Sequence, residues 1–105
     1  MAFIKAIQKS DLLPDQGRCV TLEGKRIAVF FVDGKYLAID GTCTHDLASL
    51  AEGSIQHADG HCMIECPWHG ARFDLNSGAA LTFPAVRPVQ TYPVRVEGDS
   101  IEIEI

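Results

Sequence analysis

Two short segments, each pairing a cysteine with a histidine, most constrain the fold of this 105-residue chain. The first is Cys43-Thr44-His45, and the second is Cys66-Pro67-Trp68-His69. One residue separates the cysteine from the histidine in the first pair, and two residues separate them in the second. Thiolates and imidazoles are strong ligands for transition metals. We therefore expect a fold that brings both segments to one metal centre.

The mixed composition of the pairs indicates which centre they form. It fits a binuclear [2Fe–2S] centre in which Cys43 and Cys66 hold one iron and His45 and His69 hold the other. A zinc site is the alternative, but zinc modules usually keep like ligands together, as C-x2-4-C and H-x3-5-H pairs. Glycines and a proline near the ligands also leave room for a bulkier inorganic core. The sequence favours the iron–sulfur centre over zinc.

We do not expect the remaining cysteines and histidines to bind metal. Cys19 and Cys62 lie in strand-like patterns, where a cysteine behaves as a small hydrophobic residue. A cytosolic protein is not expected to form disulfides. His57 and His61 flank an Asp59-Gly60 turn, which we interpret as a solvated hairpin rather than a second metal site.

Length, composition and charge narrow the class of protein. Apolar residues make up 47% of the chain and charged residues 22%, as in an ordinary globular protein, and the length predicts a single domain over residues 1–105. No apolar run is long enough to span a membrane, and no secretory signal pattern is present, so we expect a soluble, cytoplasmic monomer. A net charge of -5 disfavours nucleic-acid binding and favours positively charged protein partners.

The spacing of turns and strand-like runs predicts an all-β domain. Turn signals such as Asp33-Gly34 recur between β-branched and apolar runs, and the last run alternates apolar and acidic residues. No segment shows a sustained helical period. The strands predicted in the two β-rich ends are Phe3–Gln8, Gly17–Leu22, Arg26–Val32, Lys35–Ile39, Thr91–Val96 and Ser100–Ile105.

All four candidate ligands lie between residues 41 and 74. We expect this segment to form a small cluster-binding subdomain inserted into a β-barrel or sandwich base. Strand-like runs, Tyr36–Asp40 and Cys62–Glu65, precede the two ligand pairs. The ligands should therefore lie on two loops at strand ends, which a rigid sheet can hold face to face.

The sequence resembles the Rieske-type [2Fe–2S] proteins. The family's two ligand boxes match Cys43-Thr44-His45 and Cys66-Pro67-Trp68-His69-Gly70, and the similarity continues through Phe73-Asp74 and Gly78 to the closing run from Phe83-Pro84 to Ile105. The resemblance implies three stacked antiparallel sheets with the cluster at an exposed tip. It also implies that Phe83-Pro84 belongs to a third loop that covers the cluster.

Departures from the family pattern indicate the subtype. Respiratory and photosynthetic Rieske proteins carry an extra cysteine in each box, where this chain has Ala48 and Trp68, so their disulfide cannot form. They also place serine and tyrosine hydroxyls against the cluster, where this chain has Ala71 and Phe73. Losing hydroxyl donors to sulfur lowers the reduction potential, so we expect a value near the low end of the roughly -150 to +300 mV Rieske range. The resemblance points to the Rieske ferredoxins of bacterial aromatic-ring dioxygenases.

That subtype implies electron transfer rather than catalysis. An NAD(P)H-dependent flavin reductase would reduce the ferredoxin, which would pass electrons to a terminal Rieske oxygenase. Leu47, Pro67 and Trp68 flank the ligand histidines and are the expected docking face. The chain has no nucleophile–base arrangement, phosphate-binding glycine loop or nicotinamide fingerprint. Two alternatives remain open: the small Rieske-like subunit of an assimilatory nitrite reductase, and a cluster-based redox sensor.

Overall fold

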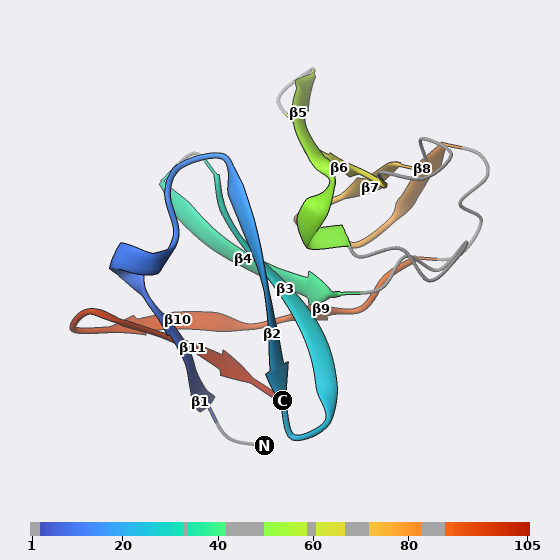
Figure 1. The fold of residues 1–105 in the computed structure, drawn as a ribbon. Helices are drawn as coiled ribbons and strands as arrows, with labels where there is room; N and C mark the ends of the chain where they lie inside the picture. The colour runs from blue at the N-terminus through green and yellow to red at the C-terminus, as the bar shows by residue number, and fades with distance from the viewer. Residues whose placement is uncertain (1–2, 33, 42–49, 59–60, 67–71, 83–87) are drawn as a thin grey trace.

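The computed structural model describes residues 3–32, 34–41, 50–58, 61–66, 72–82 and 88–105 (Figure 1). Within these ranges the regular structure is strand and short 3-10 helix, and no helix there is long and apolar enough to cross a membrane. The elements are β1 (Phe3–Gln8), η1 (Lys9–Asp11), β2 (Gln16–Leu22), β3 (Lys25–Val32), β4 (Lys35–Asp40), η2 (Leu50–Glu52), β5 (Ser54–Ala58), β6 (His61–Glu65), β7 (Arg72–Asp74), β8 (Ala80–Thr82), β9 (Thr91–Tyr92), β10 (Val94–Glu97) and β11 (Ser100–Glu104).

These strands form three sheets whose paired neighbours all run antiparallel. The terminal sheet has the order β1-β11-β10, the central sheet β2-β3-β4-β9, and the loop sheet β5-β6-β7-β8. Figure 1 shows the loop sheet at the upper right and the terminal sheet at the lower left, with β2, β3 and β4 between them. The predicted all-β fold of three antiparallel sheets is confirmed.

The core lies on both faces of the central sheet, because β3 is apolar at every position from Ile27 to Val32. Successive side chains of a strand point to opposite faces. Ile27 and Val29 pack in one hydrophobic cluster with residues of the terminal sheet, and Ala28 and Phe30 pack in a second cluster with residues of the loop sheet. All four are fully buried. Phe30 is a principal contact between the central and loop sheets. Truncating a buried phenylalanine to alanine typically lowers the free energy of unfolding by about 3–5 kcal/mol.

The predicted strand Thr91–Val96 is wrong in one respect, because it is two strands in two sheets. β9 pairs with β4 in the central sheet, whereas β10 pairs with β11 in the terminal sheet. Pro93 lies between them. Proline has no N–H to donate to a strand ladder, so the ladder is interrupted at this residue and the chain passes from one sheet to the next.

Candidate metal centre

Cys66 is the one candidate ligand among the described residues. It follows directly after β6, is 1% exposed, and packs in the same hydrophobic cluster as Leu50 and Phe73. Cys43, His45 and His69 lie outside the described residues. The same holds for the other positions singled out around the ligands, which are Leu47, Ala48, Pro67, Trp68, Ala71, Phe83 and Pro84.

The segment that contains Cys43 and His45 leaves the central sheet from a closed base. β4 ends at Asp40, and the N–H of Gly41 donates to the carbonyl of Arg26 over 2.9 Å. On the other side of the segment, the N–H of Leu50 donates to the carbonyl of Gly41, also over 2.9 Å. The two residues that flank positions 42–49 are therefore hydrogen-bonded to each other.

The segment that contains His69 has a base of its own. Glu65 at the end of β6 and Arg72 at the start of β7 are cross-strand partners. The Nε of Arg72 donates to Oε1 of Glu65 over 2.9 Å, and Nε2 of Gln56 on β5 donates to the same oxygen over 2.8 Å. The hydrogen bond from Arg72, followed by that from Gln56, holds the pKa of the Glu65 carboxyl below its usual value. The carboxylate is thus ionised at neutral pH.

Gly53 brings the two bases together. It directly follows η2, and its N–H donates to the carbonyl of Leu50 over 3.0 Å. A Cβ at this position would overlap the carbonyl oxygen of Glu65 and lie 3.2 Å from Cδ1 of Ile64. Only glycine allows this close approach of the two backbones. The first segment ends and the second begins at neighbouring points, which is the arrangement that two facing ligand loops require.

A similar contact closes the base of the segment that contains Phe83 and Pro84. Gly78 has a φ of 78°, its N–H donates to the carbonyl of Asp74, and its own carbonyl accepts the N–H of Val89, each over 2.8 Å. A Cβ on Gly78 would overlap the Val89 carbonyl oxygen. The chain therefore returns next to the loop sheet after residues 83–87.

Asp40 fixes the end of β4, from which the first segment leaves. The hydroxyl of Tyr92 donates to Oδ1 of Asp40 over 2.8 Å, and the N–H of Gln90 donates to Oδ2 over 3.1 Å. Burial, with a further contribution from the bond to Asp40, raises the pKa of Tyr92 to about 12.

The raised pKa of Tyr92 predicts a loss of stability at high pH. The folded state favours the neutral phenol, so this contribution is complete below the unfolded value of about 10 and is lost as the pH rises towards 12. We expect Tyr92→Phe to flatten the decline in the free energy of unfolding between about pH 10 and 12, at a cost of about 1 kcal/mol at neutral pH for the lost hydrogen bond. Urea unfolding at each pH measures this. Tyr36→Phe is the control, and an unchanged decline in Tyr92→Phe would assign the effect to another group.

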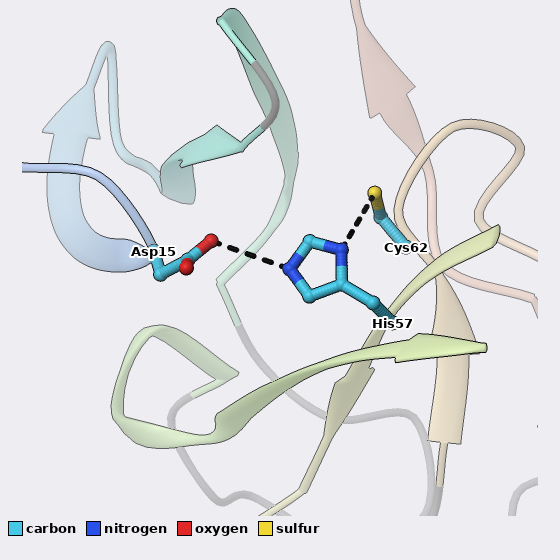
Figure 2. Close-up of polar contacts among 3 residues, drawn as sticks. All are labelled: Asp15, His57 and Cys62. Atoms are coloured by element: carbon cyan, nitrogen blue, oxygen red, sulfur yellow. Dashed lines mark hydrogen bonds and ion pairs between the residues drawn. The ribbon is translucent and has the colours of Figure 1, made fainter. Parts of the chain in front are cut away.

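A polar contact joins the residue that precedes β2 to the loop sheet (Figure 2). Nε2 of His57, on β5, lies 3.3 Å from Oδ1 of Asp15, and its Nδ1 lies 3.7 Å from Sγ of Cys62, on β6. Asp15 just precedes β2, and its side chain is 62% exposed while that of His57 is 45% exposed. A polar contact this exposed contributes at most about 0–1 kcal/mol. This contact was not predictable from the sequence because Asp15 is distant from both partners along the chain.

This contact forms neither a nucleophile site nor a metal site. Cys62 is 8% exposed and packs in the core between the central and loop sheets, as expected of a small hydrophobic residue. A substrate therefore has little access to its thiol. In the ranges that the structure describes, no three His, Cys, Asp or Glu side chains are grouped to hold a metal ion. The side chain of His61 lies outside the described residues.

The geometry around Cys66 fits an iron–sulfur centre. Cys66 is a buried cysteine at the root of one loop, with the base of a second loop beside it, and sulfur is the soft donor that such centres need. The two histidines predicted as ligands, His45 and His69, lie outside the described residues.

The chain is similar to known ferredoxins over nearly its full length. The chain is 37% identical over 103 residues to the ferredoxin component of the naphthalene 1,2-dioxygenase system of Pseudomonas putida, covering 98% of this chain and 95% of that protein. The solved ferredoxin of carbazole 1,9a-dioxygenase from Nocardioides aromaticivorans IC177 is 29% identical, with a TM-score of 0.89, and covers 98% of this chain and 97% of its own. A chain from a complex of reduced oxygenase and oxidized ferredoxin in carbazole 1,9a-dioxygenase is 32% identical, with a TM-score of 0.83, over 96% of this chain and all of that one.

The same fold occurs in another functional class. A Mycobacterium tuberculosis protein described as an NADH-dependent nitrite reductase small subunit is 27% identical, with a TM-score of 0.88, and covers 97% of this chain and 93% of its own.

The family itself follows from the match to a family model. The model for the Rieske [2Fe-2S] domain matches residues 2–93, which include every candidate ligand. The match assigns one Rieske-type [2Fe–2S] cluster to this protein. The chain therefore belongs to the Rieske [2Fe–2S] family.

Proposed function

We propose that this protein is the ferredoxin component of an aromatic-ring dioxygenase system. It carries single electrons from an NAD(P)H-dependent flavin reductase to a terminal Rieske oxygenase and catalyses no reaction itself. The observation behind this proposal is the likeness, over nearly the full length of both chains, to the naphthalene and carbazole dioxygenase ferredoxins. The likeness to a chain from an oxygenase–ferredoxin complex supports the oxygenase as a partner.

We infer that Cys43 and Cys66 hold one iron and that His45 and His69 hold the other. When bound, the cluster takes up and releases one electron. The buried position of Cys66 and the contact of Gly53 with Glu65 support this ligand set, because they place the roots of both ligand segments together. We also infer a single domain over residues 1–105, with a cluster-binding part at about 41–74, because β3 contributes to both hydrophobic clusters.

Reconstitution with the two partners tests the proposed function. Purified protein that contains iron and acid-labile sulfide is mixed with a dioxygenase reductase, NADH and a terminal oxygenase. We expect reduction of the ferredoxin by the reductase and oxygenase turnover that depends on the ferredoxin. A protein that accepts electrons from the reductase but never supports turnover of any ring-hydroxylating oxygenase would contradict the proposal.

The nitrite reductase subunit remains the second candidate because of the shared fold and the 27% identity to the mycobacterial protein. The two functions predict different assemblies. A subunit of a reductase should copurify in a fixed ratio with a large catalytic partner, whereas a shuttle should be isolated alone and bind its partners transiently. Size-exclusion chromatography of the protein from its native cells separates these outcomes.

The net charge and the expected docking face around the ligand histidines lead to separate predictions about docking. The net charge of -5 should steer the protein towards positively charged surfaces, and salt screens such attraction beyond about 10 Å at 0.1 M. We therefore expect rising salt to slow association with the reductase in stopped-flow measurements. Trp68→Leu should impair transfer at every salt concentration while the cluster stays assembled. Full activity of that variant with both partners would place the docking face elsewhere.

The residues around the ligands predict how the potential is tuned. Phe73 on β7 is fully buried and packs in the same cluster as Cys66, so a hydroxyl added there is expected to donate to a cluster sulfur. We expect Phe73→Tyr and Ala71→Ser each to raise the reduction potential, where about 59 mV corresponds to a tenfold change in a one-electron equilibrium. Redox titration measures the shift. Phe31→Tyr, on a ring that stacks against Tyr36, is the control, and unmoved potentials in folded variants would reject the hydrogen-bond explanation.

A further inference from the structure

An ion pair flanks the second ligand segment. Glu65 and Arg72 are the residues immediately before Cys66 and immediately after position 71, and they face each other across β6 and β7. Oε1 of Glu65 accepts hydrogen bonds from Nε of Arg72 at 2.9 Å and from Nε2 of Gln56 at 2.8 Å. One carboxylate oxygen thus joins three strands of the loop sheet at the point where Cys66 leaves it.

The pair lies on the face of the sheet opposite to Cys66. Side chains alternate along β6, and Ile64 and Cys66 are both buried in the core. The side chain of Glu65 is only 29% exposed and that of Arg72 is 40% exposed. Partial burial lowers the effective dielectric around the two charges, so their field extends further than that of charges fully in water.

We propose that the Glu65–Arg72 pair sets the reduction potential of the centre, with Arg72 offsetting the negative charge that Glu65 places beside the ligand segment. This inference rests on the proposed role of Cys66 as a ligand. Reduction adds negative charge, which an unbalanced carboxylate disfavours and an unbalanced guanidinium favours. Both residues act through the field and the loop base, so they are positioning residues rather than ligands.

Opposite shifts from the two single substitutions are the signature of this role. Glu65→Gln leaves Arg72 unbalanced and should raise the potential, whereas Arg72→Gln leaves Glu65 unbalanced and should lower it. We expect each to change the one-electron equilibrium by up to about tenfold, or about 59 mV. The double variant should return close to the parent value. The measurement is a redox titration of purified, cluster-containing protein.

The terminal sheet offers a matched control. Arg95 on β10 and Glu102 on β11 form an ion pair of the same kind, with Nε 2.7 Å from Oε1. Arg95→Gln and Glu102→Gln change the net charge by the same amounts on a different sheet. We expect them to shift the potential far less than the substitutions at Glu65 and Arg72.

Each outcome decides the proposal. Opposite shifts that exceed the controls, together with a near-parent double variant, support it. Shifts of one sign, shifts no larger than the controls, or none at all overturn it. If Arg72→Gln fails to retain the cluster, Arg72→Lys keeps the charge and should keep the parent potential, and a fall in its potential overturns the proposal. A parent protein that holds no iron–sulfur cluster would instead contradict the proposed function. The two failures can be told apart because the redox titration needs neither reductase nor oxygenase.

Discussion

Cys66→Ser is expected to abolish the native cluster, with loss of the visible absorption and of the two irons and two sulfides per chain that a [2Fe–2S] centre contains. A serine hydroxyl is a harder and weaker donor than a thiolate, and at a position that is 1% exposed no other donor from solvent can take its place easily. We expect the same result for Cys43→Ser and His69→Ala. Iron and sulfide analysis with visible spectroscopy measures it.

The other cysteines provide the controls for this experiment. Cys62→Ala should keep the spectrum and lower the free energy of unfolding by about 1 kcal/mol, because Cys62 is buried in the core and lies in no ligand box. Cys19→Ala, at a half-buried position on β2, should keep both the spectrum and the free energy of unfolding of the parent. One tightly bound zinc in the parent, or an intact spectrum in Cys66→Ser, would overturn the ligand assignment.

Gly53→Ala is expected to destabilise the fold by about 1–3 kcal/mol and to reduce cluster content. Its Cβ would overlap the backbone carbonyl of Glu65, so η2 and β6 must move apart. That movement separates the end of the first ligand segment from the beginning of the second. Urea unfolding measures the stability, and iron content per chain measures the effect on the centre.

Gly98→Ala separates local strain from the steric effect. Gly98 has a φ of 58°, and a Cβ there would meet nothing within 4 Å. The positive φ alone should cost about 1–2 kcal/mol without loss of cluster. If Gly53→Ala kept the parent stability and the parent iron content, the contact between the two loop bases would have no role in the site.

The strands were predictable from sequence where one local rule decides them. β1 matches its predicted bounds, and β2 and β3 each begin one residue earlier than predicted, since a strand end is set by its partner. Pro93 could be read in the sequence, but the sequence did not indicate that the chain changes from one sheet to another at this residue. Which sheet each half of Thr91–Val96 joins depends on β4 and β11, which are distant along the chain.

The candidate site shows the same division. The ligand set stays a prediction from residue types and spacing, which the sequence alone can support because the chemistry of thiolate and imidazole is local. The contacts that hold the bases of the ligand segments could not be inferred in this way, because they join residues that are distant along the chain. Asp40 with Tyr92, and Gly53 against Glu65, are contacts that only the pairing of the sheets creates. Glu65 directly precedes Cys66 in the sequence, but the sequence does not indicate its partners Arg72 and Gln56.

The pairing of β1 with β11 has a practical consequence for electrochemistry. Phe3 lies opposite Glu104 in the terminal sheet, and the central sheet separates that sheet from the loop sheet (Figure 1). An anchor fused next to either residue would therefore attach the molecule to an electrode by the side opposite to the loop sheet. Films made through either anchor should orient the protein alike and leave the loop sheet facing a partner in solution.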